Sequence, residues 1–363
     1  MAAFSVERNP HPRSDQERAA ILAAPGFGKH FTDHMVRIDF ADGAWGGGRV
    51  VPYGPLNLDP ASAVFHYGQE IFEGLKAYRQ QDGAIAAFRP DANARRFARS
   101  AQRLGMAQLP AELFVESVRA LVEVDQAWVP EQPDESLYLR PLMIATEVGL
   151  GVNSPSSTYT YLVIASPAGP YFKGGVKPVK VWLSTDYTRA APGGTGEAKC
   201  GGNYAAAFVA QAAATARGCD QVVWLDAAEH RWVEETGGMN VYFVYGSGPS
   251  ARIVTPSLTG TLLPGVTRDS LLSLAGDLGY TAEEGKISTD EWREGNASGA
   301  ITEVFACGTA AVITPIGTLK GRDFQVGSQD APAGALTMSL REELTDIQYG
   351  RREDHHDWML RLT

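Results

Sequence analysis

Residues 158–183 read TYTYLVIASPAGPYFKGGVKPVKVWL. The first eight and the last five of them are mostly apolar, β-branched or aromatic, as strands prefer. Between them lies a segment dense in glycine and proline, which interrupt regular structure. Because domain boundaries fall in such segments, this pattern predicts a division of the chain here. We expect an N-terminal domain over 1–172, a linker over 173–186 and a C-terminal domain over 187–363.

Helix and strand patterns occur on both sides of this segment. In the N-terminal part, Phe114, Val118, Leu121 and Val122 fall on one stripe of a predicted helix. The mixture of patterns predicts an α+β or α/β architecture in two domains. We expect helices over 92–103, 111–128, 204–217 and 336–360, a further helix from near Thr267, and strands that include 136–144, 158–165, 179–183 and 240–244.

The composition is that of a globular protein and narrows the function. Hydrophobic residues make up 44% and charged residues 20% of the 363 residues, which excludes wholesale disorder. The net charge of −10 disfavours broad nucleic-acid binding, which needs a basic face. The three cysteines show neither a disulfide framework nor zinc spacing. We find no pattern of a secretory signal or a membrane span and expect a cytoplasmic protein.

Five glycines in residues 191–204, APGGTGEAKCGGNY, surround Lys199. The segment does not match a phosphate-binding P-loop, because Glu197 and Ala198 precede the lysine and Cys200 follows it. Glycines let the backbone and a flat ligand approach closely, and a lysine held in a tight pocket can form a Schiff base. The alternative is a surface loop with a solvated lysine, the commoner role of a lysine taken alone.

Glu234 and Glu235 are adjacent at the end of a predicted strand, before Gly237 and Gly238. Adjacent strand residues face opposite sides, so we expect one carboxylate to point inward and the other to point to solvent. A buried carboxylate needs a cationic partner, and a protonated pyridine nitrogen would be one. The alternative is a polar turn.

Three segments offer groups that bind an anion. The segment 264–270, PGVTRDS, begins a helix with backbone N–H groups and the Thr267 hydroxyl, although Thr267 also suits ordinary helix capping. Residues 308–310 form a turn between apolar runs. The helix over 92–103 carries several arginines, one of which can turn inward to bind a phosphate while the others form a solvated face. With the lysine and the carboxylate, these segments indicate pyridoxal 5′-phosphate as the cofactor.

At these residues the sequence resembles the branched-chain-amino-acid aminotransferases, a family of fold-type IV pyridoxal-phosphate enzymes. The resemblance covers nearly the whole chain and rests on FGKHFTDHM (27–35), FHYGQEIFEGLKAYR (65–79), FRPDANARRFARSAQRL (88–104), SLYLRPLMIATEVGLGV (136–152), GEAKCGGNYAA (196–206), EETGGMN (234–240), LLPGVTRDS (262–270) and GTAAVITPI (308–316). It implies a small N-terminal α/β domain and a larger C-terminal pseudo-barrel that binds the cofactor. It also implies reversible transamination of L-leucine, L-isoleucine and L-valine with 2-oxoglutarate by a ping-pong mechanism.

The resemblance implies a role for each residue of the cofactor site. Lys199 would form the Schiff base, and Tyr204 would hydrogen-bond the phenolic oxygen of the cofactor. Glu235 would keep the ring nitrogen protonated, with Glu234 as its outward neighbour. The groups that would hold the phosphate belong to Arg96, Val266, Thr267 and Thr309.

The substrate pocket and the partner subunit follow from the same resemblance. It implies an aromatic lining for the aliphatic side chain, made of Phe31, Tyr67, Phe72, Tyr138 and Tyr171. Arg140 would meet the distal carboxylate of glutamate, and Ala310 would lie in a turn that faces the substrate carboxylate. Leu150 and Val152 would reach the site of the partner subunit in a homodimer. We expect neither a metal nor a nucleic-acid partner.

The sequence departs from the mammalian members of the family at one point. Their redox-active C-x-x-C is replaced here by Ala311 and Thr314, so we expect no such switch. Two other fold-type IV activities, D-amino-acid aminotransferase and aminodeoxychorismate lyase, remain alternatives, as does a non-catalytic protein that binds a phosphate ligand. The chirality of the amino donor, the release of pyruvate and the reaction with borohydride distinguish these alternatives.

Overall fold

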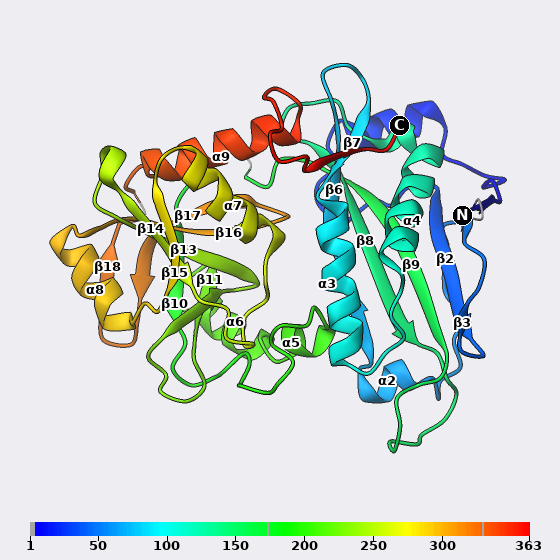
Figure 1. Cartoon of the computed structure of the whole chain (residues 1–363), viewed down its shortest axis with the longest axis horizontal. Coiled ribbons are helices and arrows are strands. Elements are labelled where there is room, and N and C mark those ends of the chain that lie inside the picture. Colours follow the sequence, from blue (N-terminus) through cyan, green and yellow to red (C-terminus); the bar gives the residue numbers. More distant parts are fainter. Residues whose placement is uncertain (1–3, 173, 329) are drawn as a thin grey trace. The chain divides into compact units, whose positions relative to one another are not determined.

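The computed structural model describes residues 4–172, 174–328 and 330–363, which fold into two compact units (Figure 1). Unit 1 comprises Met1–Tyr171, Ala198–Gly201 and Ile347–Thr363, and unit 2 comprises Phe172–Glu197 and Gly202–Asp346. These units differ from the expected domains because the segment around Lys199 and the C-terminal tail pack into unit 1. The expected linker also contains a strand of the unit 2 sheet, β10 (Val179–Leu183).

Unit 1 is built on one mixed sheet. Its ten described strands follow the order β1-β4-β2-β9-β8-β6-β7-β19, with β3 paired to β2 and β5 paired to β8. The predicted strands β8 and β9 are confirmed, and they pair antiparallel along their whole lengths. The strand bounds are β1 Ser5–Val6, β2 His34–Ala41, β3 Ala44–Trp45, β4 Arg49–Pro52, β5 Glu70–Phe72, β6 Leu75–Arg79, β7 Ile85–Phe88, β8 Ser136–Ala145, β9 Tyr159–Ala168 and β19 Met359–Arg361.

Two helices, α3 (Pro90–Arg103) and α4 (Ala111–Val124), pack together and cover one face of this sheet (Figure 1). Phe97 of α3 and Phe114 of α4 meet Tyr161 of β9, with ring centroids 5.5 and 6.2 Å apart. Full burial of such a side chain contributes about 1.5–3 kcal/mol, so this aromatic seam fixes α3 on the sheet. The other helices of unit 1 are α1 (Asp15–Leu22), α2 (Ala63–Tyr67) and the short η1 (Gln126–Trp128).

Unit 2 is built on a sheet that closes on itself. Its described strands follow the order β12-β11-β10-β17-β16-β13-β14-β15, with β18 beside β17, and β12 also pairs with β13. That additional pairing closes a ring of strands into a barrel, which confirms the expected pseudo-barrel. The remaining strands are β11 Gln221–Leu225, β12 Val233–Thr236, β13 Met239–Tyr245, β14 Arg252–Pro256, β15 Thr281–Gly285, β16 Ile301–Gly308, β17 Val312–Lys320 and β18 Gln325–Gly327.

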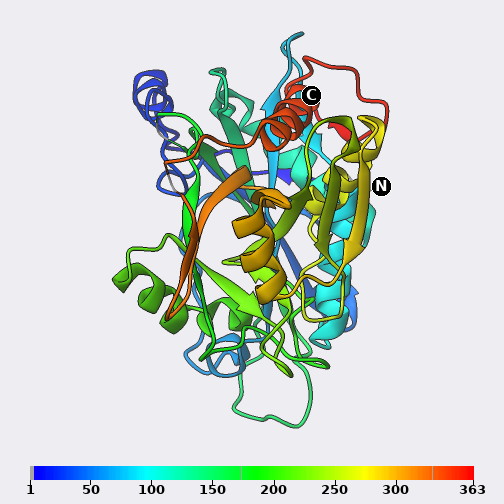
Figure 2. The same ribbon diagram turned by 90° about the vertical axis from the view of Figure 1, so that its left-hand side faces the viewer.

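Apolar side chains fill the core of unit 2, among them the fully buried Val181, Val223, Val241 and Phe243. Helix α8 (Thr289–Ser298) packs against β16 and β18 (Figure 2), and Trp292 of this helix meets Phe243 edge-on with ring centroids 5.0 Å apart. The other helices that lie wholly or mostly in unit 2 are α5 (Gly201–Ala205), α6 (Phe208–Ala216), the short η2 (Gly248–Ser250), α7 (Val266–Asp277) and α9 (Ala335–Gln348).

Two predicted helices differ from the structure. The helix expected over 204–217 is divided into α5 and α6, because a tight turn follows α5, in which the Ala207 N–H donates to the Tyr204 carbonyl at 3.0 Å. The segment 336–360 is helical only as far as the end of α9, since Gly350 adopts a φ of 66° and the chain then turns toward β19. In the described part of the chain, no helix is long and apolar enough to cross a membrane.

Candidate active site

Lys199 is held by the elements of unit 1. Its backbone N–H donates to Ser100 Oγ of α3 at 3.0 Å, and its carbonyl accepts from the Phe72 N–H of β5 at 3.0 Å. The neighbouring side chains of Ala198 and Cys200 are buried in the unit 1 core. The structure therefore excludes the solvated surface loop, because the backbone of Lys199 is fixed on both sides while its side chain is left half-buried.

Gly201 completes this attachment of the lysine segment. Its backbone N–H donates to Glu70 Oε1, and a Cβ atom added at this position would collide with the same oxygen. Glycine thus allows the close approach of this carboxylate, which would have to shift if a larger residue stood here. Burial raises the pKa of Glu70 above its ordinary value, and the hydrogen bond from Gly201 and the charge of Arg140 offset this only in part.

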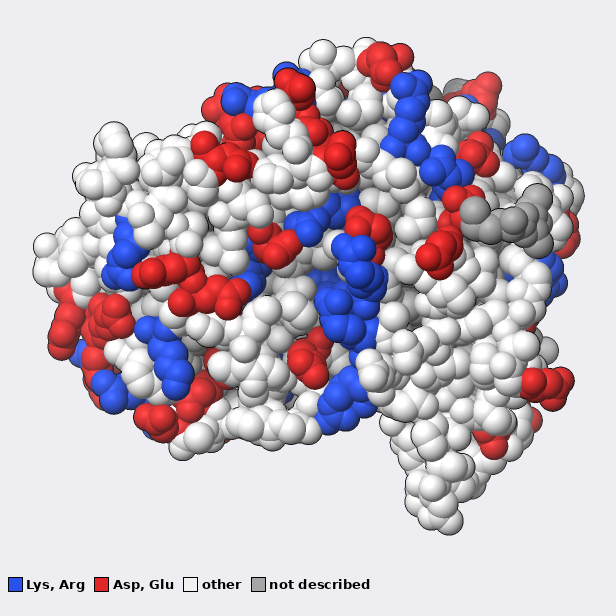
Figure 3. Space-filling view, viewed as in Figure 1, with Lys and Arg blue, Asp and Glu red and all other residues white. Residues whose placement is uncertain are grey.

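Arg96 is the arginine of α3 that turns inward, as the sequence predicts for one member of the set. It is 4% exposed and forms a bidentate ion pair with the fully buried Glu73, with Nε to Oε1 at 2.7 Å and Nη2 to Oε2 at 2.8 Å. Arg95, Arg99 and Arg103 are exposed, and basic side chains gather over α3 in Figure 3. Glu73 thus orients the guanidinium that we expect to hold a phosphate.

The Phe72 ring brings a basic side chain of β8 and the lysine together. Lys199 Nζ lies 4.9 Å from the centroid of this ring, and Arg140 Cζ lies 4.8 Å from it. Arg140 Nη2 donates to the Tyr138 hydroxyl at 3.2 Å, and that hydroxyl packs so closely on Gly74 that a Cβ atom there would collide with it. Arg140 Nε is buried and has no hydrogen-bond partner among the described residues. An amine, an aromatic wall and an unsatisfied guanidinium thus meet within unit 1.

The other predicted pocket residues make contacts elsewhere in unit 1. Phe31 stacks on Tyr53 with ring centroids 5.1 Å apart. The Tyr67 hydroxyl donates to the Leu150 carbonyl at 2.6 Å, so the loop after β8 is tied to α2. These contacts do not test a role in substrate binding, which stays a prediction for these residues. The exposed members of the set are Tyr67, Leu150, Val152 and Tyr171.

Glu235 lies on β12 in unit 2 and is 2% exposed. Its Oε1 accepts the Leu263 N–H at 2.7 Å, and its Oε2 lies 3.1 Å from Arg189 Nε, whose side chain is also buried. Arg189 further donates to the carbonyl of Thr261. The carboxylate is therefore held in position by one backbone donor and one arginine.

Glu234 is also buried, at 5% exposure, so the prediction that one carboxylate of the pair points to solvent is wrong. β12 pairs with strands on both edges, its ladder with β11 shifts register at Glu234, and residues of the loop 256–262 line the pocket beside that carboxylate. Thr261 Oγ1 donates to Glu234 Oε1. Burial raises the pKa of Glu234, and the Thr261 hydrogen bond and the Arg189 charge offset this only in part.

The predicted phosphate segment begins α7. Val266 and Thr267 are both buried, Gly265 is the N-cap, and no described side chain caps the helix. The alternative that Thr267 caps this helix is therefore wrong. Asn240 supports the segment, because its Nδ2 donates to the Leu263 carbonyl at 3.0 Å and a Cβ atom on Gly265 would collide with its Oδ1.

The remaining predicted cofactor residues lie at the same end of the unit 2 barrel. Strand register pairs Asn240 with Glu235 on one side and with Cys307 on the other. Thr309 and Ala310 occupy the turn that follows Cys307 and Gly308. Tyr204 is half-buried beside the hairpin after Glu235, where a Cβ atom on Gly238 would lie 3.5 Å from the Tyr204 ring.

Sequence reasoning missed two charged residues of these sites, Glu73 and Arg189. Glu73 lies within the mostly apolar run 71–77. A buried carboxylate requires a cation, and α3 carries several, so this position could have been predicted to form a buried ion pair. No local pattern marks Arg189. Among the described residues no cluster is suited to hold a metal, and the three cysteines are free and buried.

A family profile described as class IV amino-transferase matches residues 70–319. The chain therefore belongs to the class IV aminotransferases. It is 61% identical to the branched-chain-amino-acid aminotransferase of Mycolicibacterium smegmatis over 99% of this chain and 98% of that protein. It is 58% identical to the branched-chain-amino-acid aminotransferase of Mycobacterium tuberculosis over the same shares. Within its class, the chain is thus a member of the branched-chain-amino-acid aminotransferases.

Solved structures of this family share the fold. The T.th. branched-chain amino acid aminotransferase with pyridoxamine 5′-phosphate matches with a TM-score of 0.74 and 29% identity, over 90% of this chain and 98% of that one. The Escherichia coli enzyme matches with a TM-score of 0.71 and 26% identity, over 91% of this chain and 99% of that one. The fold expected from the resemblance is confirmed.

Proposed function

We propose that this enzyme transfers the α-amino group of L-leucine, L-isoleucine and L-valine reversibly to 2-oxoglutarate, with pyridoxal 5′-phosphate as its cofactor. The observation that carries the proposal is the pair of basic groups on the Phe72 ring, Lys199 Nζ at 4.9 Å and Arg140 Cζ at 4.8 Å. An amine for the reacting centre and a guanidinium for a carboxylate thus share one apolar wall, as the two substrate types require.

Each unit carries groups that suit this cofactor. In unit 1, Lys199 offers an amine suited to an aldehyde, and Arg96, held by Glu73, offers a guanidinium suited to a phosphate. In unit 2, Glu235 offers a fixed carboxylate suited to a ring nitrogen, and the start of α7 offers backbone N–H groups suited to a phosphate. When bound, pyridoxal 5′-phosphate supplies an aldehyde that takes up amino groups and a ring that accepts the electrons of the substrate Cα.

Each residue of the cofactor site would have its own role in the reaction. Lys199 would hold the cofactor through its Nζ, and the same amine would serve as the base that removes the proton from the substrate Cα. Glu235, braced by Leu263 and Arg189, holds a proton at the ring nitrogen. Tyr204 would donate to the phenolic oxygen. These roles follow the positions that the resemblance assigns.

One pocket must accept both an aliphatic chain and a carboxylate. Phe72 and Tyr138 provide apolar area for the former. A carboxylate left unpaired there would cost several kcal/mol, and the Nε of Arg140, buried without a partner among the described residues, meets that need for 2-oxoglutarate. We also propose a homodimer, in which the exposed Leu150 and Val152 reach the partner's site.

The visible absorbance spectrum of the purified protein tests the proposal. L-Leucine should convert the band of the lysine-bound cofactor to that of the pyridoxamine form, and D-alanine should not. Conversion by D-alanine alone would indicate a D-amino-acid aminotransferase instead. Lys199→Ala should abolish turnover while retaining some cofactor through the phosphate contacts. Substantial residual transamination by that variant would refute the role of the lysine.

A further inference from the structure

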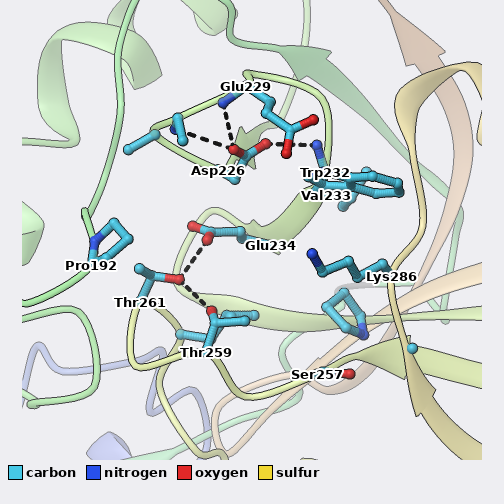
Figure 4. Close-up of a pocket in the computed structure, with 15 residues that line it drawn as sticks. Pro192, Asp226, Glu229, Trp232, Val233, Glu234, Ser257, Thr259, Thr261 and Lys286 are labelled. Carbon is cyan, nitrogen blue, oxygen red and sulfur yellow. Dashed lines mark hydrogen bonds between the residues drawn. The ribbon is translucent and has the colours of Figure 1, made fainter.

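Residues 232–234, at the start of β12, border a cavity of about 210 Å³ that the proposed transamination does not use (Figure 4). Its wall comes entirely from unit 2, from the turn 226–234, the loop 256–262 and the pair Gly285–Lys286, with Pro192 at the side. The cavity is therefore a property of one compact unit. Glu234 lies at its centre in Figure 4.

Two buried polar atoms of lining residues have no hydrogen-bond partner in the described part of the chain, Glu234 Oε2 and Trp232 Nε1. Glu234 is 5% exposed, and its other oxygen already accepts from Thr261. A buried polar group without a partner costs about 1–3 kcal/mol, and more if it is charged. Each such atom in a folded protein therefore calls for a partner. A ligand here would need a donor for Glu234 and an acceptor for Trp232.

The acidic Glu234 and the basic Lys286 lie at different ends of the cavity wall (Figure 4). Figure 4 shows the Glu234 carboxylate on the side of Thr261 and the Lys286 amine on the side of Trp232. Lys286 Nζ lies 5.3 Å from the centroid of the Trp232 ring. Of the described residues that line the cavity, Lys286 is the cationic one, and it thus lies beside the indole.

Two further acidic residues, Asp226 and Glu229, line the cavity. Asp226 accepts four backbone N–H groups of its own turn, those of residues 228, 229, 231 and 232. Burial acts to raise its pKa, but these bonds outweigh burial and hold the pKa below its ordinary value. Glu229 is exposed at the rim. Glu234 is then the lining carboxylate that is both buried and incompletely bonded.

The size of the cavity sets the size of the ligand. A water molecule takes about 30 Å³ of liquid volume, so the cavity holds roughly seven waters or a molecule of about seven to nine non-hydrogen atoms. Pro192, Pro256 and Leu262 supply apolar wall. A ligand with opposite charges at one end and a short apolar chain satisfies all of these features.

We propose that this cavity is a binding site for a small α-amino acid, whose ammonium group donates to Glu234 and whose carboxylate lies at the Lys286 and Trp232 end. The apolar side chain packs against Pro192 and Leu262. The site is distinct from the one assigned to Glu235, because the described residues that line the cavity include Glu234 but neither Glu235 nor Lys199.

Occupation of this site would be transmitted to Glu235 through the loop that joins them. Thr261 bonds to Glu234 through its hydroxyl and accepts from Arg189 through its carbonyl. Arg189 pairs with Glu235, and the Leu263 N–H donates to the same carboxylate. An ammonium group that binds Glu234 Oε2 therefore acts on a carboxylate whose other oxygen is bonded to Thr261, and through Thr261 on the support of Glu235. This regulatory consequence depends on the proposed function, whereas the binding itself does not.

Calorimetric titration of the full-length enzyme with L-valine tests the binding. The holoenzyme is first reduced with borohydride, so that no amino acid can react at Lys199. We expect one L-valine bound per chain. Glu234→Gln and Lys286→Met should each weaken binding at least about tenfold. The matched exposed controls Glu294→Gln and Lys177→Met should not change it. Lys286 is exposed, so its variant is expected to fold, and thermal unfolding checks both variants.

Ligand analogues test each half of the recognition. 3-Methylbutanoate lacks the ammonium group and 2-methylpropan-1-amine lacks the carboxylate, so both should bind at least about tenfold more weakly than L-valine. Absence of binding at millimolar concentrations would show a cavity filled only by water and overturn the proposal. Binding that survives both variants, or an amine that binds as tightly as L-valine, would also overturn it. If borohydride attaches no cofactor, the proposed transamination fails, yet the titration still reports on the cavity.

Discussion

Replacement of Glu73 by glutamine tests how the structure holds Arg96. The fully buried carboxylate accepts two bonds from Arg96 and one from Asn93, at 2.7, 2.8 and 2.7 Å. Glutamine keeps the size but removes the charge and turns one acceptor into a donor that faces the guanidinium. Removal of one partner of a buried ion pair costs about 3–5 kcal/mol, because the other charge is left buried and unpaired. We expect Glu73→Gln to lower the free energy of unfolding of unit 1 by that amount.

Hydrogen exchange of peptides from α3 and β5 across a urea series measures this loss, since exchange reports one compact unit separately from another. Glu116→Gln is the matched control, because Glu116 pairs with Arg119 at 3.6 Å with side chains 37% and 28% exposed. Such an exposed pair contributes about 0.2–1 kcal/mol. A loss for Glu73→Gln no larger than for this control would refute the reasoning.

The pH dependence of the difference in unfolding free energy between the native protein and Glu73→Gln tests the direction of the pKa shift of Glu73. Burial acts to raise the pKa of Glu73, but the charges of Arg96 and Lys199 and the hydrogen bonds outweigh it and lower the pKa. A carboxyl group with a lowered pKa stabilises the fold fully above its unfolded pKa of about 4.3 and loses this as pH falls through the folded value. The advantage of the native protein over Glu73→Gln should stay constant near neutral pH and shrink in acid.

Arg140→Ala should lower kcat/KM for 2-oxoglutarate by about tenfold to a hundredfold and affect 4-methyl-2-oxopentanoate much less; equal losses in steady-state kinetics would make Arg140 a packing residue. Gly201→Ala should lower the free energy of unfolding by about 1–3 kcal/mol, because the new Cβ collides with Glu70. Gly202→Ala meets no atom within 4 Å and is its control in thermal unfolding, where equal midpoints would contradict the collision. Burial raises the pKa of the Cys307 thiol to about 12, so maleimide should modify it only after unfolding, as mass spectrometry can show.

Those parts of the fold that depend on local pattern could be predicted from the sequence. The strands β8 and β9 and the helices α3 and α4 follow from short-range periodicity, which a single segment displays. The membership of the C-terminal tail in unit 1 could not, because β19 gains its place only by pairing with β7, which is far away in the chain. The division of the helix expected over 204–217 depends likewise on a turn without glycine or proline at its centre.

The candidate site shows the same limit at the level of single residues. Strand alternation is the basis for expecting one exposed carboxylate at Glu234 and Glu235, but the ladder shifts register at Glu234, and whether a side chain meets solvent is decided by what covers it. The loop 256–262 lies beside Glu234, and no residue pattern in the segment 234–240 predicts that a loop distant in sequence buries this side chain. The inward arginine of α3 could be expected, whereas its identity as Arg96 required the resemblance and the position of Glu73.

The position of Lys199 shows why a chemically important residue can look unremarkable in sequence. Unit 2 residues precede and follow the segment 198–201, yet Ala198 and Cys200 are buried in the core of unit 1. Two small apolar residues among glycines carry no strand or helix signal, because their attachment comes from Ser100 and Phe72, which lie about 100 residues or more away in the chain. The lysine therefore belongs to unit 1, and its backbone position is set by β5 and α3 rather than by its own neighbours in sequence.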